Sequence, residues 1–165
     1  MVGTEIAAWS RLWTTAHERL GCQILLNNFD PPPWRALGNL ETRHASGFAR
    51  YVTLVNLALA EAAPPFVTIH DVDSLAALQG RWEWGDERFY HHAKLPCSPE
   101  HLVDYAHSLA SLILAQLGAA RKCLVLDLDN TLWGGVIGDD GLEGIRLGQG
   151  DPEGESYAAF QRYAR

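Results

Sequence analysis

Long apolar runs, a cleavable leader and paired cysteines are all missing from this 165-residue sequence. No stretch of about 18 apolar residues is present that could cross a bilayer. Residues 1–20 lack the basic start, apolar centre and small-residue cleavage site of a signal peptide. The cysteines, Cys22, Cys97 and Cys123, are odd in number and widely spaced, which predicts neither a disulfide framework nor a paired-cysteine zinc site. We therefore expect a soluble, cytoplasmic protein with reduced thiols.

Basic residues are also scarce. Lys and Arg number 13 against 20 Asp and Glu, and the formal net charge is −7. A chain of this charge has no basic stripe for a nucleic acid and repels polyanions weakly at long range. We expect neither a nucleic-acid nor a membrane partner. Apolar residues make up 47% of the sequence, which is enough for a modest core.

The apolar residues follow two periodicities. Spacings of three and four predict helices over 6–20, 48–63, 71–80, 98–117 and 155–165. Short apolar runs predict strands over 22–29, 66–69 and 122–127. Helices that alternate with strands indicate an α/β fold, with a mostly parallel sheet and flanking helices.

The remaining segments lack such patterns. Residues 81–97 are aromatic, charged and aperiodic, and 134–154 are rich in glycine and acids, so both are expected to be loops. We expect a domain boundary at 118–122, where a long helix ends and a new strand begins. We expect one region over 1–118 and a second over 119–165.

Two carboxylates follow the last predicted strand, in the pattern Asp127-Leu-Asp129-Asn-Thr131. Because that strand has no polar alternation, we expect it to be buried on both faces of a parallel sheet, with the acids at its carboxyl end, where α/β sheets place their sites. One acid can attack phosphorus as a nucleophile, while the other donates a proton to the leaving oxygen and later activates water. Because nucleophile and phosphate are both anions, a divalent cation such as Mg²⁺ is expected. The alternative is that both acids only end a strand and cap a turn.

The residues around this pattern are more specific than the two acids. The run from Lys122 to Gly141 includes Trp133-Gly134-Gly135 and resembles the first motif and flap of the haloacid dehalogenase superfamily, within it the FkbH-like branch. The resemblance extends over roughly 81–165, supported upstream by residues that include Trp84, Asp86, Arg88, Lys94 and Ser98-Pro99.

The resemblance implies roles for these residues. Asp127 is expected to be the nucleophile that forms an aspartyl phosphate, and Asp129 the general acid and base. Thr131 orients the loop, supported by Trp133, Gly134 and Gly135. Mg²⁺ is expected on the Asp127 carboxylate and the backbone carbonyl of Asp129. The later family motifs, a Ser or Thr, a Lys and further acids, find no counterpart in the 36 residues after Asp129, so we expect a truncated domain that is inactive by itself.

The same resemblance implies a substrate and a partner. FkbH-like proteins load a glyceryl unit from 1,3-bisphosphoglycerate, a phosphorylated three-carbon substrate, onto an acyl carrier protein in polyketide-type biosynthesis. Longer members resemble a fusion with an SGNH-hydrolase-like region, of which 1–118 is expected to be the latter part, without the Gly-Asp-Ser nucleophile motif of that fold. The alternative is a non-catalytic module that docks a carrier protein or scaffolds a larger enzyme.

Several other residues resemble functional residues but have a structural explanation. Asp71-Val-Asp73-Ser74 copies the acidic pattern, but Asp73 is better explained as a helix cap. His91 and His92, with Asp86, lack the spacing of a metal-ligand set. We expect Cys123 to be a buried structural thiol and Cys97 to be inert. Turn formation explains Asn27 and Asn28 as well as an oxyanion role does.

Overall fold

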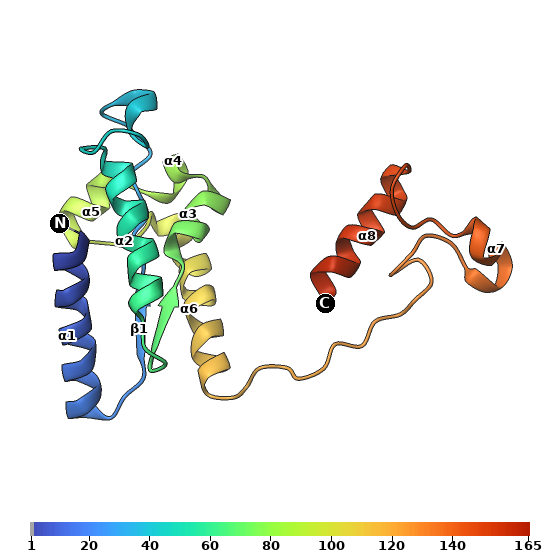
Figure 1. The fold of residues 1–165 in the computed structure, drawn as a ribbon, viewed down its shortest axis with the longest axis horizontal. Helices are drawn as coiled ribbons and strands as arrows, with labels where there is room; N and C mark the ends of the chain where they lie inside the picture. The colour runs from blue at the N-terminus through green and yellow to red at the C-terminus, as the bar shows by residue number, and fades with distance from the viewer. Residues whose placement is uncertain (1) are drawn as a thin grey trace. The chain divides into compact units, whose positions relative to one another are not determined.

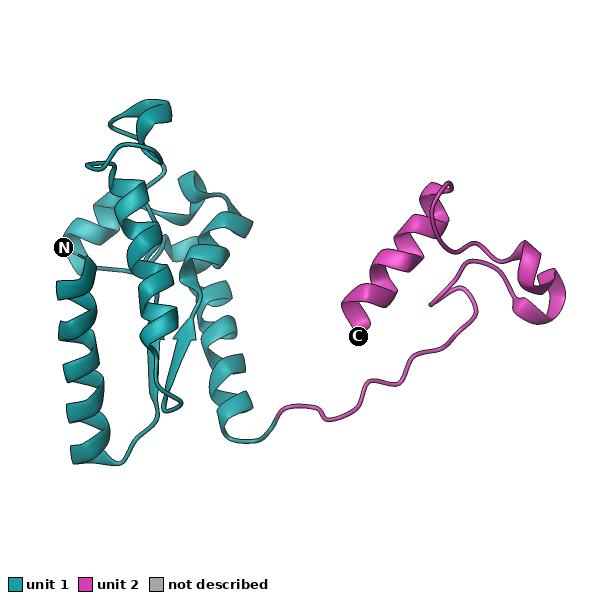
Figure 2. Cartoon of the chain, in the orientation of Figure 1, with its two compact units in different colours: residues 1–119 teal, residues 120–165 magenta. Residues whose placement is uncertain are grey.

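A computed structural model describes residues 2–165 of the chain. It has the predicted α/β character and divides into two compact units, residues 1–119 and 120–165 (Figure 2). The elements of the first unit, in chain order (Figure 1), are α1 (Val2–Leu20), β1 (Ile24–Asn27), η1 (Gly38–Leu40), α2 (Phe48–Ala62), β2 (Val67–His70), α3 (Val72–Gln79), α4 (Arg81–Trp84), α5 (Glu87–Ala93), η2 (Pro99–His101) and α6 (Leu102–Gln116). The second unit contains α7 (Ile137–Gly144) and α8 (Pro152–Ala164).

The sheet of the first unit has two strands. β1 and β2 are parallel, with Ile24 opposite Val67 and Asn27 opposite His70. The parallel arrangement confirms the prediction for these two strands. Both strands end at the same edge, so Asn27 and His70 lie side by side there.

The helices bury two apolar clusters, of which the first packs against this sheet. In the first, α1 and α2 contribute Trp13, Val55 and Leu59, which pack with Val67 of β2. Leu59 is completely buried. The second cluster joins α3, α4 and the segment before η2 through Val72, Ala76, Trp84 and Cys97. Burial of apolar side chains is the dominant favourable term in folding, so these clusters hold the first unit together.

The start of α2 is capped by a distant carboxylate. Glu41, only 2% exposed, accepts hydrogen bonds from the backbone N–H of Leu37 and of Ala49, both at 3.1 Å. Gly47, at the N-cap, has no side chain to do this. The two donated hydrogen bonds, that of Leu37 first, lower the pKa of Glu41, and the charged carboxylate also suits the positive end of the helix.

Two predictions in the first unit are wrong. Residues 81–97 are not simply a loop, because they contain α4 and α5; Asp86 caps α5 by accepting from the N–H of Arg88. Asp73 is not the cap of the short helix. Asp71 accepts from the N–H of Ser74, since the helix begins directly after β2, while Asp73 forms an ion pair with Arg81.

The predicted strand 122–127 is also wrong. The segment is extended, but it belongs to no strand, and Leu124 and Val125 are 66% and 87% exposed. Cys123 is accordingly exposed and not buried. A strand requires hydrogen-bonding neighbours, and within residues 2–165 the strands that form pair only with each other. An apolar composition alone therefore does not make residues 122–127 a strand.

In the second unit, α7 replaces part of the loop predicted at 134–154, and α8 confirms the predicted final helix. Among the described helices, none is both long and apolar enough to cross a membrane.

Candidate functional site

The chain turns sharply directly after Asp127. The carbonyl oxygen of Leu128 accepts from the N–H groups of Thr131 (3.2 Å) and Leu132 (2.8 Å), and Asn130 has the left-handed φ of 53°. Asn adopts this conformation more readily than most residues. The carboxylate of Asp127 accepts from the N–H of Leu128 at 2.8 Å and is exposed.

Asp129 is held from two sides. Its Oδ1 accepts from the indole Nε1 of Trp133 at 3.0 Å and from the N–H of Ile137 at 3.2 Å. The side chain is partly buried. These two donors orient the carboxylate and connect it to the beginning of α7.

The glycine pair after Trp133 closes the loop. Gly134 exchanges backbone hydrogen bonds with Arg146, at 3.0 and 2.8 Å. A Cβ on Gly134 would lie 2.9 Å from the ring of Tyr157, so a side chain has no room there. Gly135 has a φ of 98°, and its N–H donates to the side-chain oxygen of Asn130 at 2.9 Å. Glycine at both positions therefore permits the loop to close on itself.

Residues beyond the motif fix the loop further. Asp140 accepts from the N–H of Val136 at 2.8 Å, and Gln161 of α8 donates to the carbonyl of Leu132 at 2.7 Å. Arg146 pairs with Glu153 of α8. The contributions of Asn130 and Asp140 were not predicted; an asparagine directly after Asp129 and an acid beside a glycine were the only signals in the sequence.

The structure thus brings Asp129, Trp133, Gly134 and Gly135 together in one hydrogen-bonded loop. Thr131 takes part through its backbone N–H. Asp127 precedes the loop, and no hydrogen bond joins its carboxylate to the other motif residues within the described chain. No group of three or more His, Cys, Asp or Glu that could hold a metal ion occurs among residues 2–165.

The other residues considered from the sequence have structural partners. Asp86 pairs with Arg88, and His91 and His92 lie in the last turn of α5. Cys97 is buried, and burial raises the pKa of its thiol, which keeps it protonated and unreactive.

Asn27 and Asn28 are not turn residues only. Asn28 donates to Asp71 at 2.7 Å and accepts from the N–H of Asp73 at 2.9 Å, so it ties the end of β1 to the start of α3. Asn27 contacts a buried histidine, which the sequence did not single out.

No family model matches the chain, and no curated protein matches it. Among solved structures, the chain is similar to one that contains a phosphatase domain, and this likeness supports a phosphatase-like fold. That structure is the N-terminal part of the protein BF1531 from Bacteroides fragilis, complexed with Mg. The two are 28% identical with a TM-score of 0.82; the similarity covers 96% of this chain and 43% of that chain, so this chain spans less than half of its neighbour's length.

Proposed function

We propose that this chain carries the nucleophile loop of a Mg²⁺-dependent phosphatase that uses Asp127 as nucleophile and Asp129 as general acid and base. The observation that carries the proposal is the similarity to the Mg-bound phosphatase-domain structure over 96% of the chain. The acidic pattern, with Asp129 oriented by two N–H donors two residues after an exposed Asp127, is consistent with it.

The proposed reaction has two steps. A carboxylate oxygen of Asp127 forms a bond to phosphorus while the bond from phosphorus to the leaving oxygen breaks, and Asp129 donates a proton to that oxygen. Asp129 then takes a proton from water, whose oxygen attacks the aspartyl phosphate and releases phosphate. The fixed orientation of Asp129 favours this role, because proton transfer requires the donor within hydrogen-bonding reach of the leaving oxygen.

The residues present fit a magnesium ion. Mg²⁺ prefers oxygen ligands, and it commonly keeps several waters while it binds one or two carboxylates and the substrate phosphate. The Asp127 carboxylate and the backbone carbonyl of Asp129 would hold it, and both supply hard oxygen donors. When bound, the ion would neutralise charge between the nucleophile and the phosphate.

We further propose an FkbH-like activity for the protein. The substrate would be a phosphorylated three-carbon compound, 1,3-bisphosphoglycerate, whose glyceryl unit passes to an acyl carrier protein in polyketide-type biosynthesis. The motif residues Trp133-Gly134-Gly135 and the flap after them support this assignment. We also propose that residues 1–118 derive from an SGNH-like region and that 119–165 begin the phosphatase domain.

One observation favours a second candidate, a non-catalytic module that docks a carrier protein. Within residues 2–165, no cluster of three metal-binding side chains is formed. A chain that supplies two oxygen ligands by itself is expected to bind Mg²⁺ weakly and to release no phosphate above background.

The test measures phosphate release from acetyl phosphate with Mg²⁺ by the full-length gene product, and the mass of a carrier protein after incubation with 1,3-bisphosphoglycerate. Asp127→Asn should abolish phosphate release, because the amide keeps the shape but cannot form an acyl phosphate. Asp139→Asn is the matched control; Asp139 is exposed in α7 and should tolerate the change. Undiminished release by Asp127→Asn would remove Asp127 from the nucleophile role. A wild type that binds the carrier protein but releases no phosphate would favour the docking module.

A further inference from the structure

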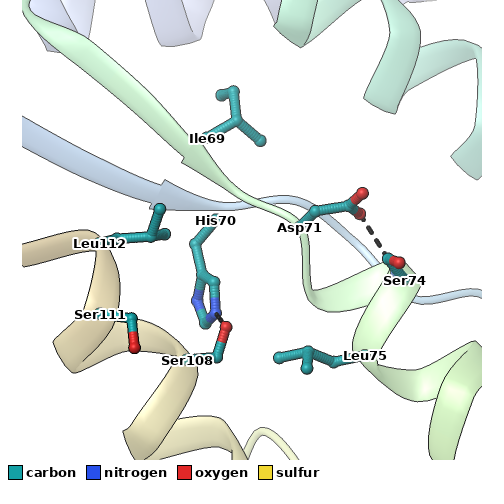
Figure 3. Close-up of a pocket in the computed structure, with 8 residues that line it drawn as sticks. All are labelled: Ile69, His70, Asp71, Ser74, Leu75, Ser108, Ser111 and Leu112. Atoms are coloured by element: carbon teal, nitrogen blue, oxygen red, sulfur yellow. Dashed lines mark hydrogen bonds between the residues drawn. The ribbon is translucent and has the colours of Figure 1, made fainter. Parts of the chain in front are cut away.

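A pocket of about 390 Å³ opens in the first unit, where β2 ends and α3 begins (Figure 3). His70 and Asp71 come from the end of β2, and Ser108 lines the pocket from α6. All residues that line this pocket belong to the first unit, whereas Asp127 and Asp129 belong to the second. This pocket and the proposed phosphatase activity therefore rest on different residues.

Three side chains form a continuous hydrogen-bonded chain at this pocket. The Oδ1 of Asn27 lies 2.9 Å from Nδ1 of His70, and Nε2 of His70 lies 2.9 Å from the hydroxyl oxygen of Ser108 (Figure 3 shows the second contact). The residues come from β1, β2 and α6, so only the folded chain brings them together. Their sequence separations are 43 and 38 residues.

The hydrogen-bond partners of His70 determine which of its two ring nitrogens carries the proton. Asn27 donates from its Nδ2 to the hydroxyl of Tyr105 at 2.8 Å, so its Oδ1 faces His70. A carbonyl oxygen only accepts hydrogen bonds; Nδ1 of His70 must therefore carry the hydrogen. Nε2 is then the acceptor, and the Ser108 hydroxyl donates to it.

The imidazole is also kept neutral. His70 is 1% exposed, and burial lowers its pKa, an effect that the nearby charge of Asp71 partly opposes. The other titratable group that faces the ring is Tyr105, with ring centroids 5.3 Å apart. A neutral histidine that accepts from a serine hydroxyl is the arrangement that activates a serine nucleophile, with a third residue orienting the base.

We propose that Ser108 is a nucleophile toward uncharged esters of short acyl groups, with His70 as its base and Asn27 as the residue that positions His70. The oxygen of Ser108 forms a bond to the acyl carbon and the bond to the ester oxygen breaks. The proton of Ser108 passes to Nε2 of His70 and from there to the leaving alcohol. Water then hydrolyses the acyl-serine and restores the hydroxyl.

The pocket suits such a substrate. Ile69, Leu75 and Leu112 provide apolar walls, and the volume is sufficient for a short acyl chain. Asp71 lines the same space, and its carboxylate would repel an anionic acyl group. Ser74, which carries an O–H donor, also lines the pocket.

The first experiment treats the chain with an uncharged ethyl fluorophosphonate probe and maps the modified residue by mass spectrometry. The serine oxygen displaces fluoride from phosphorus, and His70 takes the proton. We expect one adduct, on Ser108, which is absent from Ser108→Ala. Ser156→Ala is the matched control, because Ser156 is an exposed helical serine whose hydroxyl donates to the carbonyl of Glu153. p-Nitrophenyl acetate should acetylate the same residue.

The second experiment separates a base from a structural histidine. Asn27→Asp keeps the acceptor oxygen, and Tyr105 can donate to the new carboxylate. A negative charge beside His70 raises its pKa, so the midpoint of the labelling rate should move upward by about one pH unit or more. His70→Gln should reduce labelling about 100-fold or more.

Two results would overturn the proposal. One is a wild-type chain with a native circular dichroism spectrum in which Ser108 remains unlabelled. The other is a labelling rate whose pH midpoint is the same in Asn27→Asp as in the wild type. A hydrogen-bond network that is only structural would leave this midpoint unchanged. Because Asn27→Asp retains the acceptor, the test stands even where His70→Gln fails to fold.

Discussion

Replacement of Leu59 by alanine should destabilise the first unit by about 3 kcal/mol. Leu59 is fully shielded from solvent, with Trp13, Val55 and Val67 around it. The loss has two parts, the transfer free energy of the removed isopropyl group and the cavity that remains. Indole and β-branched side chains collapse poorly into such a space, so the cavity part should persist. Since a domain is stable by roughly 5–15 kcal/mol, this single change would remove a large share of the free energy of unfolding.

The assay is urea denaturation followed by far-ultraviolet circular dichroism, with two control variants. Leu57→Ala, on the same helix and 58% exposed, should change stability by no more than about 0.5 kcal/mol. Leu59→Met conserves volume and should cost less than about 1.5 kcal/mol. Equal losses for Leu59→Ala and Leu57→Ala would refute the placement of Leu59 in the core.

Three further predictions concern the loops. The N–H groups that donate to Glu41, that of Leu37 first, lower the pKa of its carboxylate, so Glu41 stabilises the fold above its unfolded pKa and this contribution is lost as pH falls through its folded pKa. The difference in melting temperature between wild type and Glu41→Gln should therefore narrow from pH 7 to pH 3. A constant difference would contradict this role of Glu41. Gly47→Ala should lower the melting temperature, because its Cβ would lie 1.9 Å from a backbone oxygen, and an unchanged value would show that the turn can open. Asp140→Ala should speed amide exchange at Val136, because the Asp140 carboxylate accepts a hydrogen bond from that N–H. Unchanged exchange would show that the loop keeps its structure without this hydrogen bond.

Local pattern predicted much of the first unit. The apolar spacing over residues 6–20 and 48–63 corresponds to α1 and α2, which each bury one face in the core. Two β-branched or apolar runs correspond to β1 and β2. α4 and α5 were missed because helices of four and seven residues are too short to show a repeat. The only local signal for α5 was Asp86 as its cap.

Long-range partners explain the remaining differences. The composition of residues 122–127 suits a strand, but strand formation also depends on a neighbour that composition does not reveal. Likewise, Asp127, Asp129 and the two glycines were visible as a motif, whereas the anchoring of Asp129 by Trp133 depends on the turn between them. The hydrogen-bonded chain of Asn27, His70 and Ser108 could not be predicted, because its three residues lie far apart in the sequence.

The unpaired segment after α6 has a consequence for how the protein is handled. A protease must draw about ten residues of backbone into its cleft, which helices and paired strands resist and unpaired chain permits. Here two exposed basic residues, Arg121 and Lys122, open a stretch that belongs to neither helix nor strand. Trypsin at low concentration should therefore cut first at this point. The two products should correspond to the two compact units, which would make each of them accessible to separate study.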